Sequence, residues 1–137
     1  MQAPFDIAAD LDTPVSAYLK LRDLKPRFLL ESVEGGERLA RYSFLGFGDA
    51  LEVRMDAESL QINGETRPRP TNQVEYLDAL REALAAAPRP GPAVDGLPFD
   101  GGLVGVSGYD VVRLFERLPT ETTPQTNVPD AAFAAPV

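Results

Sequence analysis

The sequence contains no cysteine and no histidine among its 137 residues. Without cysteine the chain can form no disulfide, supply no thiolate to a metal and offer no cysteine nucleophile. Without histidine it lacks the most common general base and the most common metal ligand of proteins. Most familiar catalytic arrangements are therefore excluded from this chain.

Positive charge is scarce: 13 Lys and Arg stand against 21 Asp and Glu, which gives a net charge of −8. No Lys/Arg cluster is present to neutralise phosphates, so we expect no nucleic-acid partner. No apolar run approaches the length of a membrane span, and the first ten residues, MQAPFDIAAD, lack the basic and apolar regions of a signal peptide. We therefore expect no membrane partner and a cytoplasmic location.

What is present has globular composition, with 44% hydrophobic and 25% charged residues. A chain of this length fits one domain and can bury a core without disulfides or a structural metal. The tail after Pro119 shows no clear period and ends without a helix cap. We therefore expect the chain to be a piece of a longer polypeptide.

Two amphipathic helices are predicted in the first 90 residues. Thr13 can cap a first helix with Pro14 at its first position, and Pro26 should end it. Thr71 opens a second helix up to an alanine-rich end, and this helix should pack on a sheet. The residues expected on the apolar side are Val15, Tyr18, Leu19 and either Leu21 or Leu24 in the first helix. In the second helix they are Val74, Leu77, either Leu80 or Arg81, and Leu84.

Short apolar runs separated by turns predict strands. They lie at 27–33, 42–47, 51–55 and 59–62, and the last precedes the hairpin signal Asn63-Gly64. Residues 85–98 have linker chemistry, and 101–119 should form a glycine-rich strand that runs into a short helix near Asp110.

The strand at 27–33 carries a carboxylate and a hydroxyl side by side, at Glu31 and Ser32. Both of its faces are otherwise largely apolar, which predicts a strand covered on both sides. In one interpretation Glu31 pairs with Arg38 or Arg41 and Ser32 bonds a backbone group. In the other, the pair forms part of a small-molecule pocket in which a carboxylate suits an ammonium group.

Glycines recur every three residues at Gly102, Gly105 and Gly108. The spacing fits neither the dinucleotide fingerprint nor the P-loop, both of which bind phosphates. We interpret these glycines as structural, permitting a close approach of another segment or a bend in the strand.

Two long motifs, LLESVEGGERLARYSFLG (29–46) and GGLVGVSGYDVVRLFERLP (101–119), resemble the N-terminal region of anthranilate synthase component I, a chorismate-utilising enzyme. The resemblance extends from about Thr13 to Pro129. The related aminodeoxychorismate and isochorismate synthases share the second motif and usually match the first less closely. One departure is Val106-Ser107, where relatives commonly carry an aromatic residue after the glycine.

The resemblance implies a role in a lyase. In that family the complete polypeptide converts chorismate and ammonia to anthranilate and pyruvate with Mg²⁺, and a glutamine amidotransferase subunit, component II, supplies the ammonia. The chorismate site and the metal carboxylates lie in a larger C-terminal catalytic domain. Residues 1–137 would then be the N-terminal regulatory domain, without catalytic residues or a cofactor of its own, and inactive alone.

The resemblance also implies a fold and a ligand. The fold class is α+β, with antiparallel, orthogonally packed sheets covered by helices. The family's feedback site for the inhibitor L-tryptophan carries over as Leu30, Glu31 and Ser32. Two alternatives are the corresponding domain of aminodeoxychorismate synthase, where tryptophan would be structural, and a plain interaction domain that packs against a partner.

Overall fold

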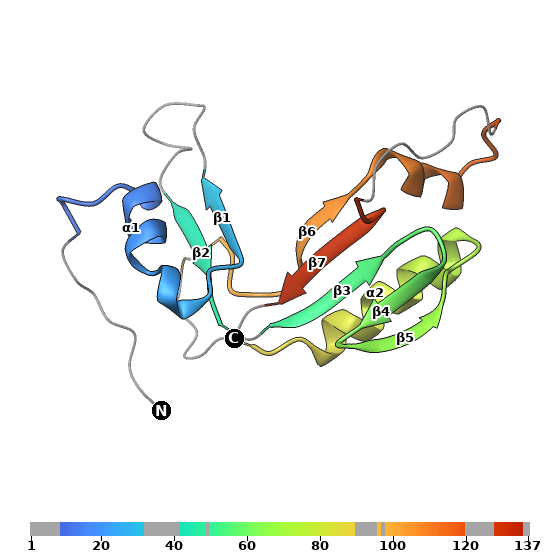
Figure 1. The fold of residues 1–137 in the computed structure, drawn as a ribbon, viewed down its shortest axis with the longest axis horizontal. Helices are drawn as coiled ribbons and strands as arrows, with labels where there is room; N and C mark the ends of the chain where they lie inside the picture. The colour runs from blue at the N-terminus through green and yellow to red at the C-terminus, as the bar shows by residue number, and fades with distance from the viewer. Residues whose placement is uncertain are drawn as a thin grey trace. The chain divides into compact units, whose positions relative to one another are not determined.

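The computed structural model describes residues 9–31, 42–48, 50–89, 96, 98–119 and 128–135. The chain divides into two compact units (Figure 1). The first unit comprises residues 1–50, 88–101 and 136–137, and the second comprises residues 51–87 and 102–135. The assignment of the whole chain to one regulatory domain stays a prediction.

The first unit opens with helix α1 (Pro14–Lys20). The Thr13 side chain accepts from the backbone N–H of Ser16, and the Ser16 side chain accepts from that of Thr13, forming a capping box. The predicted start of this helix is therefore confirmed. Its apolar Val15 and Leu19 are 51% and 62% exposed, and α1 contributes no buried residue.

The first helix ends six residues before Pro26, earlier than predicted. After α1 the backbone tightens into the 3₁₀ turn η1 (Arg22–Leu24), and Lys25 then adopts the left-handed conformation with φ of 54°. The N–H of Lys25 bonds to the carbonyl of Arg22, which closes this end of the helical segment. The chain therefore leaves the helix before proline could interrupt it.

Strands β1 (Phe28–Glu31) and β2 (Ser43–Gly46) form an antiparallel pair in which Phe28 lies opposite Gly46. The ring of Phe28 occupies the space beside Gly46, since a Cβ built there would lie 2.7 Å from the ring's Cζ. Glycine is thus required at this position for the ring to cover the partner strand. Both predicted strands are confirmed over their described residues.

The second unit is built on a five-stranded antiparallel sheet in the order β5-β4-β3-β7-β6 (Figure 1). An antiparallel mixed α and β structure confirms the expected fold class, while orthogonal packing of the sheets stays a prediction. The strands are β3 (Leu51–Met55), β4 (Ser59–Ile62), β5 (Glu65–Pro68), β6 (Val104–Ser107) and β7 (Ala131–Ala135).

Strands β3 and β4 have the predicted bounds, whereas β5 and β7 were not predicted. Asn63 and Gly64 form the turn into β5 with φ of 50° and 84°, which confirms the hairpin signal. β5 is polar and β7 is mostly alanine, so neither carries the alternating β-branched pattern typical of strands. The residues after Pro119, interpreted as patternless, thus supply a strand in the interior of the sheet.

Helix α2 (Gln73–Ala86) begins at the cap residue Asn72, whose side chain accepts from the N–H of Glu75. Its buried residues are Tyr76 and Ala83, seven positions apart and therefore on one face. The predicted apolar face was partly wrong. Leu77 and Leu80 are partly buried against the core, but Val74 and Leu84 are 66% and 53% exposed.

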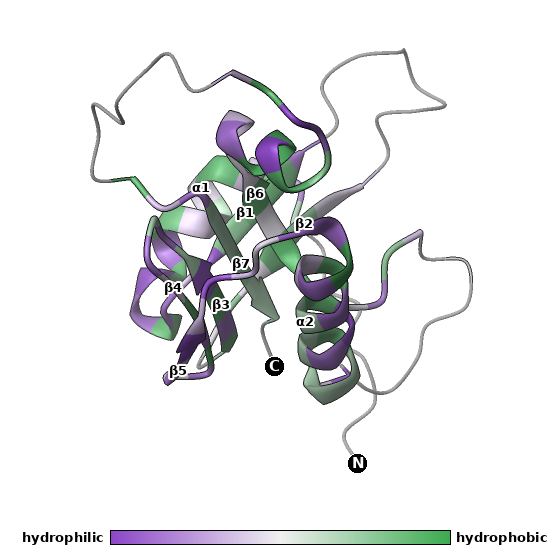
Figure 2. Ribbon diagram, turned by 90° about the vertical axis from the view of Figure 1, so that its right-hand side faces the viewer, coloured by the Kyte–Doolittle hydropathy of each residue, from purple (hydrophilic) through white to green (hydrophobic). Residues whose placement is uncertain are grey.

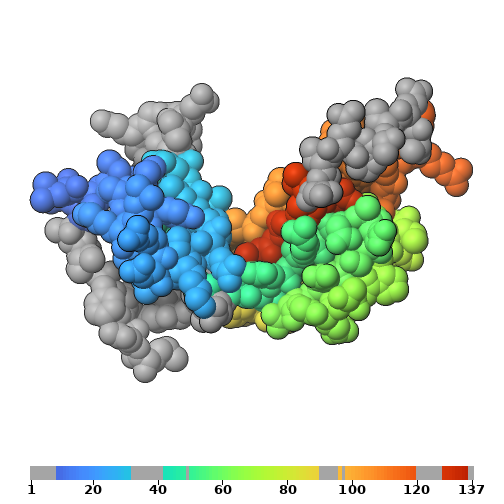
Figure 3. Space-filling view, viewed as in Figure 1, coloured from blue at the N-terminus to red at the C-terminus, as the bar shows by residue number. Residues whose placement is uncertain are grey.

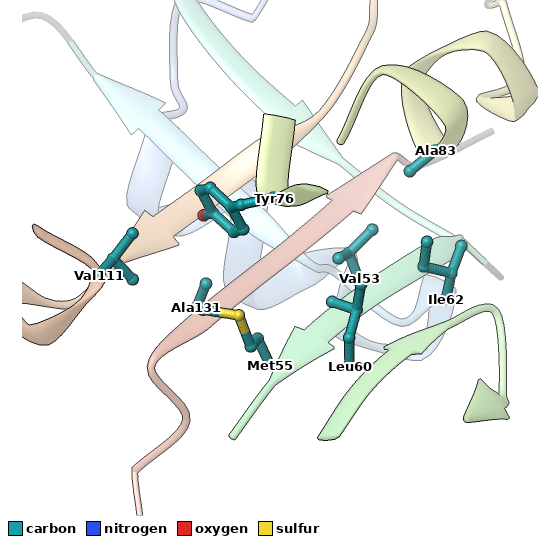
Figure 4. Packing of buried hydrophobic residues seen from close by; sticks show 8 residues of the cluster. All are labelled: Val53, Met55, Leu60, Ile62, Tyr76, Ala83, Val111 and Ala131. Atoms are coloured by element: carbon teal, nitrogen blue, oxygen red, sulfur yellow. The ribbon is translucent and has the colours of Figure 1, made fainter. Parts of the chain in front are cut away.

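Helix α2 covers one face of the sheet, and the core lies between them (Figure 4). In the close-up, Met55 of β3 and Ala131 of β7 lie next to each other beneath the helix. The small side chain of Ala83, fully buried, lets α2 approach the sheet closely. The core residues are Val53, Met55, Leu60, Ile62, Tyr76, Ala83, Val111 and Ala131.

The predicted strand and short helix within 101–119 are β6 and the 3₁₀ helix η2 (Tyr109–Leu114), whose Val111 joins the core. Of the predicted linker, positions 90–95 and 97 lie outside the described residues. Among the described elements of the second unit, no helix lies on the opposite face of the sheet, which is turned toward the viewer in Figure 3.

Candidate functional site

The predicted ligand-binding residues lie at the end of β1. Leu30 pairs with Phe44 and Glu31 pairs with Ser43 on β2. Leu30 is 40% exposed and Glu31 is also exposed, so both are accessible to a ligand. Ser32 lies outside the described residues, as do Arg38 and Arg41.

The prediction that β1 is covered on both faces is wrong for the described end of the strand. Among the described residues no polar or charged side chain is buried, and Glu31 is no exception. β2 is the only described strand that pairs with β1. An exposed carboxylate does not need a partner, so burial gives no argument for a pocket at Glu31.

Leu30 and Glu31 project from opposite faces of β1, because side chains alternate along a strand. Leu30 shares its face with Phe28 and with Phe44 of β2, whereas Glu31 shares its face with Ser43. A single ligand can reach both side chains only around the end of β1, where the chain continues to Ser32.

Sequence reasoning missed an aromatic cluster, defined here as Phe28, Tyr42, Phe44 and Phe99. The Phe99 ring meets Phe28 and Phe44 edge-on, with ring centroids 6.5 Å and 5.4 Å apart. Tyr42 stacks on Phe44 at 6.1 Å and 27°. The spacing of Tyr42 and Phe44 signals a shared strand face, but nothing local links Phe99 to them.

The glycine-rich segment has the structural role that was predicted. A Cβ at Gly105 would lie 2.6 Å from the Cα of Phe133 on β7, so only glycine fits this close approach. The N–H of Gly108 donates to the carbonyl of Asp130 at 2.6 Å. These glycines therefore serve strand pairing between β6 and β7.

Both units carry ion pairs among the described residues, for example Lys20 with Asp12 in the first unit and Arg67 with Glu82 in the second. The Arg67 guanidinium bonds the Glu82 carboxylate at 2.6 Å and thereby lowers the pKa of Glu82. Backbone N–H groups of Glu58 and Ser59 lower the pKa of Asp56. Both shifts therefore arise from local structural contacts on the surface.

No group of three or more acidic, His or Cys side chains is placed to hold a metal ion in the described part of the chain. Within the same residues, no helix has both the length and the apolar character needed to span a membrane.

Comparison with solved structures identifies the fold. The chain matches the crystal structure of anthranilate synthase component I from Streptococcus pneumoniae with a TM-score of 0.52 at 22% identity. The match covers 99% of this chain and 28% of that one, and it establishes the fold alone. No protein-family model matches the sequence.

The sequence relatives are more specific. The chain is 42% identical over 130 residues to anthranilate synthase component 1 of Thermus thermophilus, covering 93% of this chain. It is 43% identical over 121 residues to the component 1 of Pseudomonas aeruginosa and 42% identical over 131 residues to that of Synechocystis. The resemblance to the N-terminal region of anthranilate synthase component I is thus confirmed.

The matched region is a minor part of each relative. The chain spans 26%, 23% and 25% of the Thermus, Pseudomonas and Synechocystis proteins, in each case at the N-terminal end. The chain therefore matches the N-terminal quarter of these relatives.

Proposed function

We propose that this chain acts as the N-terminal regulatory domain of anthranilate synthase component I. The complete lyase would convert chorismate and ammonia to anthranilate and pyruvate with Mg²⁺, in the cytoplasm. A C-terminal catalytic domain would hold chorismate and the metal, and the amidotransferase component II would supply ammonia. The observation that carries this proposal is the 42% identity with the Thermus protein over 93% of this chain.

We further propose that Leu30, Glu31 and Ser32 contribute to a feedback site for L-tryptophan. Leu30 and Glu31 are exposed, so a ligand can reach them without unfolding β1. The Glu31 carboxylate suits the α-ammonium group of an amino acid. Leu30 lies on the face of the aromatic cluster, which offers an apolar surface to an indole ring.

The opposite orientation of Leu30 and Glu31 constrains how tryptophan would bind. The ammonium group would lie at the end of β1 near Glu31 while the indole extends toward the face that carries Leu30. Such a ligand is only half enclosed by β1 and β2. Further contacts would come from the polypeptide that follows the matched quarter in the relatives, and binding would change the state of that polypeptide.

Calorimetric titration with L-tryptophan tests the site directly. The protein to use is the 137-residue chain and a chimera in which this chain replaces the matching quarter of the Thermus thermophilus relative. D-tryptophan and L-phenylalanine are the control ligands. Glu31→Ala and Ser32→Ala should weaken binding about tenfold or more, the effect of losing a charge-assisted hydrogen bond.

Glu116→Ala is the matched control, because Glu116 is an exposed glutamate of the second unit. It should bind L-tryptophan as the parent does. In the chimera, L-tryptophan should inhibit anthranilate formation from chorismate and ammonia, and Glu31→Ala should relieve the inhibition. An active chimera that neither binds nor responds to L-tryptophan would refute the regulatory role and retain the family assignment.

A further inference from the structure

The two outer strands of the five-stranded sheet differ in character. On β5, Glu65, Arg67 and Pro68 place two charges and a proline in four residues, and Figure 2 shows this strand as hydrophilic throughout. Arg67 also bonds Glu82 of α2 at 2.6 Å. Charges and proline on an edge strand discourage pairing with further strands. The β5 edge is therefore protected.

The other edge, β6, has none of these features. Its sequence VGVS contains no charge and no proline, and Val106 is 64% exposed. The described strands offer β6 a single neighbour, β7. An exposed, uncharged edge strand invites the addition of another strand.

The register shows which backbone groups of β6 are available. The N–H of Gly108 donates to the Asp130 carbonyl. This pair of residues continues the register in which Val104 lies opposite Ala134 and Val106 lies opposite Ala132. Since hydrogen-bonding direction alternates along an antiparallel strand, Val104 and Val106 bond toward β7. The N–H and C=O groups of Gly105 and Ser107 therefore point outward from the sheet.

The sheet face opposite α2 is apolar beside this edge. Side chains alternate, so the residues of β6 and β7 on this face are Val104, Val106, Ala132 and Ala134. On the same face but farther from β6, the side chains are polar or charged: Glu52 and Arg54 on β3, and Gln61 on β4. The small apolar strip on β6 and β7 therefore lies beside the edge at which backbone N–H and C=O groups of β6 point outward from the sheet.

We propose that β6 is a pairing edge at which a further β-strand extends the sheet, supplied by the polypeptide that follows this region in the relatives. The inference rests on the proposed function, in which this chain operates with that polypeptide. The Thermus relative is covered only to 26%, so most of its length lies outside the matched region. The free backbone groups of Gly105 and Ser107 specify a strand as the occupant, and the uncharged apolar strip specifies one with small or apolar side chains.

Residue-resolved amide hydrogen exchange tests this proposal. The 137-residue chain is compared with the Thermus chimera described above. In the chimera, the N–H groups of Gly105 and Ser107 should exchange about tenfold or more slowly than in the chain alone, because pairing removes them from water. The amides of β7 should be protected in both proteins and report that the sheet is folded.

Variants on the two edges supply the matched comparison. Val106→Lys should lower the Tm of the chimera and leave that of the 137-residue chain nearly unchanged, because a lysine on β6 opposes strand addition. Thr66→Lys places the same charge on the protected β5 edge, where Thr66 is exposed, and should change neither Tm. Equal effects of the two lysines would contradict the proposal.

Three further results would also overturn it. Equal exchange of the Gly105 and Ser107 amides in both proteins would leave β6 unpaired. Protection that rises with the concentration of the 137-residue chain alone would identify a second copy as the occupant. A chimera that fails to fold where the Thermus parent folds would show that its polypeptide does not accept this edge.

The exchange measurement is independent of tryptophan. Protected β6 amides in a chimera that ignores L-tryptophan would retain the pairing edge and reject the feedback site. Inhibition by L-tryptophan without protection of the β6 amides would retain the feedback site and reject the pairing edge.

Discussion

The phenol oxygen of Tyr76 on α2 lies 3.0 Å from the Oγ of Ser107 on β6, so one hydrogen bond joins the helix to the edge strand. Tyr76 is 3% exposed, and its ring also meets Phe115 edge-on at 6.2 Å. The serine therefore satisfies a hydroxyl that the core would otherwise bury without a partner.

Replacing Ser107 should reveal this role. Ser107→Ala leaves the Tyr76 hydroxyl unpaired, and the free energy of unfolding should fall by about 1–2 kcal/mol, measured by urea denaturation. The double variant Ser107→Ala with Tyr76→Phe removes both hydroxyls and should recover part of that loss. A double variant less stable than the sum of the two single losses would contradict this account.

Arg69 joins three segments of the second unit. Its guanidinium bonds both the Asp130 carboxylate, just before β7, and the Asp56 carbonyl, at the end of β3. Both ionic side chains are about three-quarters buried, with 23% and 25% exposure. Arg69→Met should reduce the free energy of unfolding by about 2 kcal/mol, since it leaves the carboxylate partly buried and unpaired.

Two further variants test whether the loss of stability comes from the ion pair itself. Arg69→Lys retains the charge, but an ammonium group lacks the planar guanidinium that bonds both oxygens. The free energy of unfolding should therefore fall by roughly half as much as in Arg69→Met. Adding Asp130→Asn to Arg69→Met should restore some stability. Denaturation that is insensitive to all three changes would mean that the ion pair contributes nothing to the fold.

The close approach at Gly105 should not tolerate a side chain. A Cβ there would lie 2.6 Å from the Cα of Phe133, and the backbone of β7 cannot move aside without breaking its pairing with β3. Gly105→Ala should destabilise the chain by about 2 kcal/mol through overpacking. Val106→Ala, an exposed change in the same strand, should cost less than about 0.5 kcal/mol.

Acid should weaken the turn between β3 and β4. Asp56 accepts from the N–H groups of Glu58 and Ser59 at 3.0 Å and 2.9 Å, and these bonds lower its pKa below the usual 3.8. A carboxyl with a lowered folded pKa stabilises the fold above its unfolded pKa and loses that contribution as pH falls through the folded value.

Urea denaturation at neutral pH and at about pH 2.5 should therefore show an acid-induced loss. Asp56→Asn should be less stable than the parent at neutral pH, and the difference should shrink as the pH falls and the parent carboxylate gains a proton. Glu116→Ala, which changes an exposed carboxylate outside this turn, should parallel the parent. A constant difference between parent and Asp56→Asn across this range would exclude a role for ionisation.

Much of the local structure was predictable. Thr13 and Pro14 mark the start of α1, and Asn63-Gly64 marks a hairpin whose left-handed turn few other residues could form. Strands β3 and β4 follow from their apolar alternation. These signals are local, so each depends on residues only a few positions apart.

Other features could not be predicted because they depend on distant partners. β7 is mostly alanine, and it becomes a strand because β3 and β6 pair with it on either side. The buried face of α2 is set by Tyr76 and Ala83, which fit the sheet beneath, and not by the more apolar Val74. Tertiary contacts overrode the local pattern in both cases.

The candidate site also combines features that the sequence predicts with features that only the structure shows. The sequence by itself determined the family resemblance and named Leu30, Glu31 and Ser32, because those residues stand in a recognisable motif. Strand alternation also placed Leu30 and Glu31 on opposite faces of β1. Only the tertiary structure decided that both are exposed, and that Phe99 joins Phe28 and Phe44. Motifs are local in the chain, whereas exposure and strand edges depend on which distant segments pack together.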